Sequence, residues 1–162
     1  CSDKLFMGMK IIIPIGISGS GKSRLYDMEY QDYVNVCPDD IRRELTGNIS
    51  DQSRNKEVFK IAQKMIDDRI ANDRDVFYDA TNINTEYRKK FVNKYKGTDV
   101  KIIYVILPVD VNVSNERIKN DLNNKVDRSK VSYQVLLRQY EMYKETLNSQ
   151  FKDENVNEII YL

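Results

Sequence analysis

The feature that most constrains this chain is the octapeptide from Gly16 to Ser23, which reads Gly-Ile-Ser-Gly-Ser-Gly-Lys-Ser. It matches G-x-x-x-x-G-K-[ST], the pattern of a loop whose backbone N–H groups surround phosphate groups. Residues 10–15, just before it, are a short apolar run typical of a buried strand, and residues 24–30 read as a helix. Strand, glycine loop and helix form the context that this motif requires, so we expect a P-loop that binds a nucleoside triphosphate.

Individual positions of the loop carry separate expectations. Lys22 should reach the β- and γ-phosphates, and the hydroxyl of Ser23 should bind Mg²⁺. ATP and Mg²⁺ are therefore the expected cofactors. The residues expected to bind ATP, through backbone or side chain, are Gly16, Ile17, Ser18, Gly19, Ser20, Gly21, Lys22 and Ser23.

Length and composition narrow the class of protein. With 162 residues, of which 41% are hydrophobic and 31% charged, the chain resembles one globular domain. It has no apolar run of the ~18 residues that a membrane helix needs, so no membrane partner is expected. Its two cysteines are too few for a disulfide framework, which favours the reducing cytoplasm. Because the chain has no histidine, a general base near neutral pH must be a carboxylate or another side chain.

Apolar periodicity predicts the domain boundary and the fold. Residues 1–9 show no periodic signal and should be disordered or left over from cloning, whereas residues 10–162 should form one P-loop domain. Strands are expected at residues 10–15, 34–37, 75–79, 100–107 and 158–162. Helices are expected at residues 24–30, 39–45, 54–72, 86–95, 113–122 and 132–147. This alternation predicts an α/β fold of the P-loop NTPase type, with a five-stranded parallel sheet flanked by helices.

Four polar or turn-forming positions follow the first four of these strands. They are Gly16, Asp39, Asp79 and Pro108. Since the carboxyl ends of parallel strands lie at one edge of a sheet, we expect these four positions to converge on one site.

A second pattern resembles a nucleotide-binding motif, but its surroundings in the sequence indicate a chance match. Residues 124–127 read Asn-Lys-Val-Asp and match the N-K-x-D sequence by which GTPases recognise guanine. In that class the motif directly follows a buried strand, whereas here it follows the polar end of a predicted helix. The chain also lacks a D-x-x-G sequence after the third strand. Guanine recognition is therefore not expected.

Asp39 and Arg42 are the residues that favour a kinase. Phosphoryl transfer to a hydroxyl needs a base for the proton and cations around the migrating group. Asp39 follows the second strand, where an acceptor would enter, and Arg42 lies three residues later on the same helix face. One could take the proton while the other binds an anionic group of the acceptor. From position alone, Asp39 could equally be a helix cap.

At this point the chain resembles a known family, the polynucleotide 5′-hydroxyl kinases of phage and related small P-loop kinases. The P-loop matches, and residues 39–42, Asp-Asp-Ile-Arg, are similar to that family's D-D-x-R motif. The resemblance implies that Asp39 is the general base, that Arg42 contacts an acceptor phosphate, and that the activity serves nucleic acid repair. Residues 79–84 resemble the family's segment after the third strand, which implies acceptor contacts by Thr81, Asn82 and Arg88. Residues 133–143 are similar to the helix that follows the lid in that family.

The chain departs from the family pattern at two places. Ala80 separates Asp79 from Thr81, so Asp79 is expected to approach Mg²⁺ as a Walker-B-like carboxylate. Val131-Ser132 stands where the family has Val-Pro after its lid arginines.

We therefore expect a basic lid in which Arg117 and Arg128 are catalytic. Val131, which follows them, is expected to contact the substrate. Residues 117–138 hold six basic side chains against two aspartates: Arg117, Lys119, Lys125, Arg128, Lys130 and Arg138, with Asp121 and Asp127. The chain lacks the D-x-D-G signature of a phosphatase, so kinase activity alone is expected.

Three functions remain open on the sequence. The first is an ATP-dependent kinase for the 5′-hydroxyl of DNA or RNA, and the second is a small-molecule kinase for a nucleoside or nucleotide. The third is a nucleotide-binding switch without catalysis. The sequence does not decide between DNA and RNA, and it leaves a homo-oligomer open.

Overall fold

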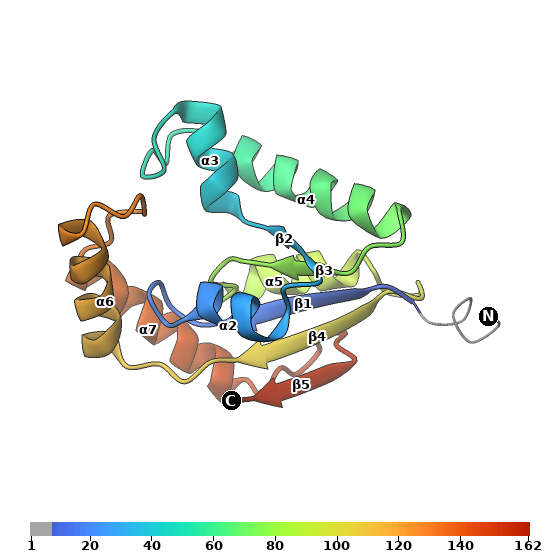
Figure 1. The fold of residues 1–162 in the computed structure, drawn as a ribbon. Coiled ribbons are helices and arrows are strands. Elements are labelled where there is room, and N and C mark those ends of the chain that lie inside the picture. Colours follow the sequence, from blue (N-terminus) through green and yellow to red (C-terminus); the bar gives the residue numbers. More distant parts are fainter. Residues whose placement is uncertain (1–7) are drawn as a thin grey trace.

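A computed structural model describes residues 8–162, and its centre is a five-stranded sheet in the order β2-β3-β1-β4-β5 (Figure 1). The strands are β1 (Lys10–Ile15), β2 (Val34–Val36), β3 (Val76–Tyr78), β4 (Lys101–Ile106) and β5 (Glu158–Tyr161). All four pairings are parallel, and Ile12 of β1 lies opposite Phe77 of β3 on one side and Ile103 of β4 on the other. The predicted P-loop NTPase fold, with a five-stranded parallel sheet, is confirmed.

The helices lie close to their predicted positions. They are α2 (Lys22–Glu29), α3 (Pro38–Thr46), α4 (Asn55–Ala71), α5 (Thr85–Asn93), α6 (Val111–Asn123) and α7 (Tyr133–Asn148). Helix α2 covers one face of the sheet, while α5 and α7 lie behind the other (Figure 1). Helices α3 and α4 pack against each other, and α4 also contacts β2, the strand at one edge of the sheet, and its neighbour β3 (Figure 1).

Alternation along the strands separates two apolar clusters. On one face Ile12, Phe77 and Val105 are buried against Leu25 and aromatic side chains of α2 and the segment after it. On the opposite face Ile11, Ile13 and Ile15 join a larger core to which α4, α5, α6 and α7 contribute. Because side chains of successive strand residues point to opposite faces, a continuous isoleucine run can supply both clusters at once.

Helix α3 begins at Pro38, one residue before the helix expected at residues 39–45. Proline has no N–H to leave unpaired and its φ suits the first turn, so it favours the first position of a helix. Cys37 occupies the cap position, and no side chain caps the helix. The alternative that Asp39 is the helix cap is therefore wrong, because Asp39 already lies inside the first turn. By contrast, the side chain of Asn84 caps α5, because it accepts the N–H of Tyr87.

Of the residues 1–9 that were expected to be disordered, 1–7 lie outside the described residues. Met9 already adjoins the sheet, since its carbonyl accepts the N–H of Lys101 at 2.9 Å. None of the helices within residues 8–162 combines the length and the apolar composition that crossing a membrane would require.

Candidate active site

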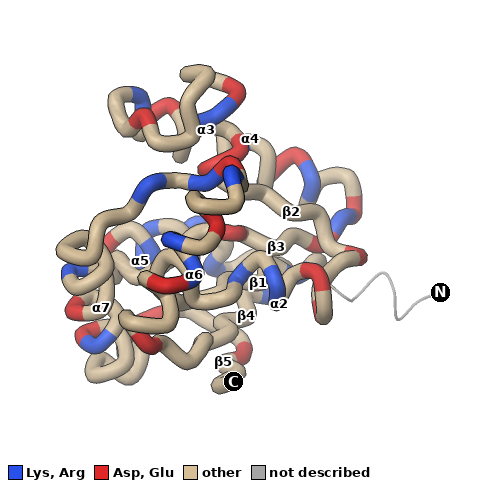
Figure 2. The backbone as a smooth tube through the Cα atoms, turned by 60° about the vertical axis from the view of Figure 1, so that its left-hand side comes forward, with Lys and Arg blue, Asp and Glu red and all other residues tan. Residues whose placement is uncertain are grey.

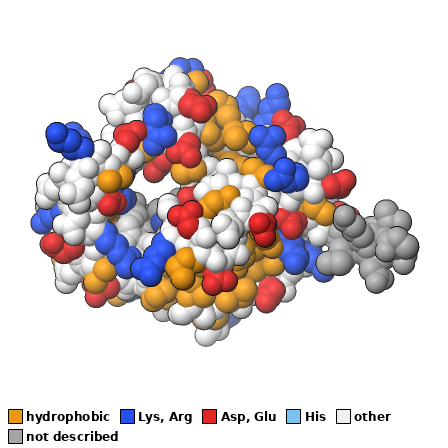
Figure 3. Space-filling view, in the orientation of Figure 1, with side chains coloured by type: hydrophobic (Ala, Val, Ile, Leu, Met, Phe, Trp, Pro, Cys, Tyr) orange, Lys and Arg blue, Asp and Glu red, His pale blue; other side chains and the backbone are white. Residues whose placement is uncertain are grey.

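A cavity of about 790 Å³ lies at the carboxyl ends of β1, β2 and β3. Figure 3 shows it as a hollow between the part of the molecule that holds α6 and the part that holds α2 and α3. The P-loop, the start of α3, the end of β3 and the segment after α6 supply its walls. The ends of three of the four strands therefore meet here. Asp39, Asp79 and P-loop residues from Ser18 onward line the cavity, whereas Gly16 itself and Pro108 do not. The end of β4 is instead bound to α7, because the carbonyl of Leu107 accepts the hydroxyl of Tyr143 at 2.7 Å.

The P-loop holds Lys22 as a buried cation. Its Nζ donates to the carbonyls of Ile17 at 2.7 Å and Gly16 at 3.3 Å. Burial lowers the pKa of Lys22 to about 8, and the carboxylates of Asp79 and Asp39 oppose that shift. Because both partners are neutral carbonyls, a desolvated ammonium group can exchange them for charged phosphate oxygens with a gain in electrostatic energy.

Two glycines give the loop its concave shape. Gly19 and Gly21 have φ of 74° and 103°, in the left-handed region that side chains with a Cβ rarely adopt. At Gly19 there is also no room, because a Cβ would lie 2.9 Å from the carbonyl oxygen of Ser114. The hydroxyl of Ser20 is buried without a hydrogen-bond partner among the described residues. An unpaired donor beside a loop of N–H groups fits a polyphosphate ligand.

Ser23 and Asp79 provide oxygen atoms suited to Mg²⁺. Ser23 Oγ lies 3.5 Å from Asp79 Oδ2. Burial raises the pKa of the Asp79 carboxyl, and the nearby Lys22 ammonium acts in the opposite direction. Within residues 8–162, no group of three or more His, Cys, Asp or Glu side chains could hold a metal ion. Mg²⁺ bound with a nucleotide takes most of its ligands from phosphate and water, so one hydroxyl and one carboxylate could complete its coordination.

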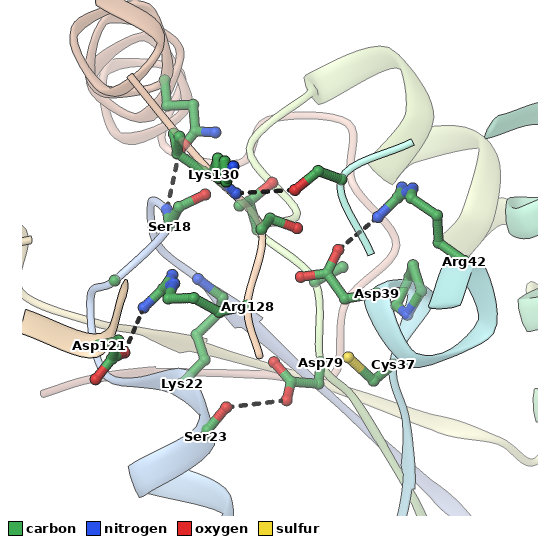
Figure 4. A pocket seen from close by; sticks show the side chains of 18 of the residues that line it. Ser18, Lys22, Ser23, Cys37, Asp39, Arg42, Asp79, Asp121, Arg128 and Lys130 are labelled. Atoms are coloured by element: carbon green, nitrogen blue, oxygen red, sulfur yellow. Dashed lines mark hydrogen bonds and ion pairs between the residues drawn. The ribbon is translucent and has the colours of Figure 1, made fainter. Parts of the chain in front are cut away.

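Asp39 is held by Arg42 on the opposite wall (Figure 4). Arg42 Nη1 donates to Asp39 Oδ1 at 2.5 Å, while Nε and Nη2 donate to Asn55 Oδ1 of α4 at 3.2 and 3.0 Å. The Arg42 side chain is only 5% exposed, whereas that of Asp39 is 47% exposed. Arg42 therefore fixes a carboxylate that remains open to the cavity. Only the Arg42 N–H groups that do not take part in these three hydrogen bonds would be available to contact an acceptor.

The basic residues after β4 form the remaining wall. We call residues 124–132, between α6 and α7, the lid segment. Arg117 of α6 donates to the carbonyl of Gly19 at 3.1 Å, and Arg128 of the lid segment pairs with Asp121 at 2.8 Å. Both arginines line the cavity, and Arg128 lies near enough to Lys22 to lower the pKa of that lysine. Val131 lines the cavity as well.

The lid segment is attached to the α3 side of the cavity by three contacts. Asp127 accepts from Arg43 Nε at 2.6 Å, the hydroxyl of Ser129 donates to the carbonyl of Ile49, and the N–H of Lys130 donates to Ser50 Oγ. In Figure 2 the segment crosses from α6 towards α3, with basic positions along it. The lid segment thus connects α6 with the α3 side of the cavity.

The N-K-x-D pattern has no guanine-binding context. Asn124 follows α6 as its C-terminal cap, and Asp127 is occupied by Arg43. The positions of Asn124 and Asp127 therefore agree with the expectation that the match is a coincidence.

Two residues expected at the acceptor lie elsewhere. Arg88 is paired with Glu154, and the two side chains are 1% and 0% exposed. Its guanidinium also lies over the rings of Tyr104 and Phe151, at 5.7 and 5.5 Å from their centroids. The expectation that Arg88 binds the acceptor is therefore wrong, because its charge is neutralised inside the core.

Asn82 is the second correction. Its side-chain amide donates to the carbonyls of Pro14 at 2.8 Å and Ala80 at 3.0 Å, and its φ is 55°. Asn82 therefore joins the ends of β1 and β3 and does not line the cavity. Thr81, next to it, does line the cavity, and its carbonyl accepts the N–H of Gly16 at 3.1 Å.

Three side chains of the site had no signal in the sequence. Gln139 of α7 accepts the N–H of Ser18 at 2.8 Å and so joins α7 to the P-loop. Asn55 orients Arg42, and Phe59 of α4 lines the cavity on the side of Asp39. Each belongs to a helix whose amphipathic pattern indicates only which face is buried.

Comparison with known proteins agrees with this geometry. A family model described as an AAA domain matches residues 11–146. No curated protein sequence matches the chain. A chain in the structure of the Pnkp1/Rnl/Hen1 RNA repair complex is 20% identical, with a TM-score of 0.77 over 88% of this chain and 46% of that one. A chain from a second structure of the Pnkp1/Rnl/Hen1 complex is 25% identical, with a TM-score of 0.60 over 68% and 39%.

A gluconokinase from Sinorhizobium meliloti 1021 has the same fold. It is 19% identical, with a TM-score of 0.54 over 97% of this chain and 82% of its own. The chain spans less than half the length of the two proteins from the repair complexes. These likenesses show the fold of a P-loop kinase.

Proposed function

The chain belongs to the AAA-domain family, and from that premise we propose that it is an ATP- and Mg²⁺-dependent kinase for the 5′-hydroxyl of DNA or RNA. The observation that carries the proposal is the position of Asp39. Its carboxylate faces the same cavity as Lys22, and a buried arginine holds it there. A nucleotide-binding switch needs no such carboxylate opposite its P-loop, whereas a kinase needs a base for the acceptor hydroxyl.

The residues of this chain divide the reaction between them. The P-loop N–H groups and Lys22 hold the triphosphate, and Ser23 with Asp79 would hold Mg²⁺, which neutralises phosphate charge when bound. Asp39 accepts the hydroxyl proton as the acceptor oxygen bonds to the γ-phosphorus and the bond to the ADP oxygen breaks. Arg117 and Arg128 stabilise the negative charge that develops on the migrating group.

Acceptor binding falls to the opposite side of the cavity. Arg42, Thr81 and Val131 line it beside Asp39, and we assign them to the acceptor. In this scheme Arg42 has two tasks, orienting Asp39 and offering its remaining N–H groups to an acceptor phosphate.

A polynucleotide acceptor is supported by two separate facts. Residues 39–42 match the D-D-x-R motif of polynucleotide kinases, and two structures with this fold come from complexes named for Pnkp1, Rnl and Hen1, one of them called an RNA repair complex. A small-molecule acceptor is the second candidate, because the gluconokinase shares the fold over 82% of its own length.

Labelled ATP separates the candidates. The protein is incubated with γ-labelled ATP, Mg²⁺ and, in parallel, 5′-hydroxyl DNA and RNA oligonucleotides, nucleosides, nucleotides and gluconate. Transfer to the oligonucleotides is the expected result. Transfer only to a small molecule would replace the polynucleotide with that acceptor, and ATP binding without transfer to any acceptor would identify a switch.

A further inference from the structure

Phe59 is an exposed aromatic residue in the wall of the cavity. It lies on α4 and is 46% exposed, yet it lines the cavity together with Asp39 and Arg42. It belongs to neither apolar cluster, and within residues 8–162 no other aromatic ring pairs with it. Its ring is therefore not needed for the core and is open to a ligand.

The helix places this ring beside the proposed base. Asn55 accepts two hydrogen bonds from Arg42, and Phe59 follows four residues later, one helical turn along the same face of α4. Asp39 is thus hydrogen-bonded to Arg42, Arg42 is hydrogen-bonded to Asn55, and Phe59 lies one helical turn beyond Asn55. We place the ring on the acceptor side of the cavity, because Phe59 shares α4 with Asn55, the partner of Arg42; Val131 of the lid segment is a further apolar residue of the cavity lining.

We propose that Phe59 stacks on the nucleobase of the acceptor's terminal nucleoside and so makes the site prefer a base-bearing acceptor. The inference rests on the proposed kinase function and adds how the acceptor is selected. Every base offers a flat face, so stacking on an aromatic ring favours nucleosides without selecting among the four bases. It also disfavours sugars and other alcohols that lack a ring of this kind.

Ile61 provides a matched control. It lies on the same helix and is 36% exposed, but it does not line the cavity. Single exposed apolar residues of this kind are common and have no function of their own. A specific role for Phe59 therefore predicts that the two positions respond differently to substitution.

The test uses two acceptors and four variants. One 5′-hydroxyl oligonucleotide carries a base on its terminal nucleotide, and the other is abasic at that position. KM and kcat for each acceptor, KM for ATP, and the melting temperature are measured for the wild type, Phe59→Ala, Phe59→Leu, Phe59→Tyr and Ile61→Ala. Phe59→Leu keeps the apolar bulk and so removes the ring with the least risk to folding.

We expect Phe59→Ala and Phe59→Leu to raise KM for the base-bearing acceptor by about 5- to 150-fold, the range for one base–aromatic stack. KM for the abasic acceptor and for ATP should not change. Phe59→Tyr, which keeps a ring, should retain the wild-type KM, and so should Ile61→Ala. The wild type should itself prefer the base-bearing acceptor by a similar factor.

Two results would overturn the inference while leaving the kinase function intact. One is an unchanged KM for the base-bearing acceptor in both Phe59→Ala and Phe59→Leu, and the other is an equal loss with both acceptors. Failure of the wild type to phosphorylate either oligonucleotide would overturn the proposed function and this inference together. That failure is seen without any variant, so the two cases are distinguishable.

Discussion

Ser23 and Asp79 lie 56 positions apart in the sequence, yet Ser23 Oγ is 3.5 Å from Asp79 Oδ2. The hydroxyl comes from the first turn after the P-loop and the carboxylate from the end of β3. Strand β3 is the neighbour of β1 in the sheet, so the two side chains meet although α3 and α4 intervene in the sequence. A hydroxyl and a carboxylate at this separation suit one hard cation.

The first prediction follows from this pair. Asp79→Asn removes a charged oxygen ligand, so the Mg²⁺ concentration for half-maximal transfer should rise by about 10–100-fold. Titration of activity with Mg²⁺ at saturating ATP measures it. Asp40→Asn is the control, because the Asp40 side chain is 63% exposed and pairs with Arg43. Equal Mg²⁺ curves for wild type and Asp79→Asn would contradict the assignment.

Lys22 should be essential for transfer yet unfavourable for folding. Its pKa is lowered from 10.5 to about 8, so the fold is destabilised while the lysine is charged, by at most on the order of 3 kcal/mol. The effect is full below about pH 8 and fades as the pH rises towards 10.5. Lys22→Met lacks the buried charge and should melt at a higher temperature without ATP, while losing transfer.

Melting curves without ATP, recorded at about pH 7 and about pH 9.5, test this sign. The advantage of Lys22→Met over the wild type should be larger at the lower pH. A difference that stays constant between the two pH values would show that burial of the charge is not its cause. Wild-type turnover by Lys22→Met would contradict the whole P-loop assignment.

Asp39→Asn tests the proposed base. Asparagine can still accept a hydrogen bond from Arg42 but cannot take the hydroxyl proton, so kcat should fall by roughly 10²–10⁴-fold. Affinity for ATP should stay near that of the wild type. Asp40→Asn changes the neighbouring, exposed carboxylate and should leave kcat unchanged. Near-normal transfer by Asp39→Asn would move the search for the base to Asp40 or Asp79.

Arg128 should act on the reaction more strongly than a basic residue outside the cavity. Arg128→Ala removes a cation from the cavity wall, and kcat at saturating ATP should drop by about 10²–10³-fold. Lys119 lies on α6 but does not line the cavity, so Lys119→Ala should have little effect. Small and equal effects of the two variants would mean that the lid segment is only a solvated surface.

Arg88 should matter for stability and not for the acceptor. Arg88→Ala leaves the buried carboxylate of Glu154 unpaired, which should lower the free energy of unfolding by about 3–5 kcal/mol. Urea denaturation measures the loss, with Arg54→Ala as the control for an exposed ion pair. KM for the acceptor should not change. A raised acceptor KM with unchanged stability would return Arg88 to the site.

Local patterns were sufficient for much of this protein. The P-loop spans eight consecutive residues, and β1 begins and ends where the apolar run does. The parallel five-stranded sheet also agrees with the expected fold, since short apolar strands that alternate with helices favour parallel pairing. The position of Asp79 at the end of a strand could also be predicted, because the apolar run of that strand directly precedes it in the sequence.

The tertiary structure alone decided which of the later side chains face the cavity. Arg88 and Glu154 are 66 positions apart, and Ser18 and Gln139 are 121 apart. A motif shows that a side chain is present near a strand end, but its direction depends on a partner elsewhere in the chain. Arg88 lies in the core because it pairs with the buried carboxylate of Glu154. Gln139 contacts the P-loop because α7 packs behind the sheet. Charge pairing and helix packing of this kind act between distant residues, so no window of the sequence contains them.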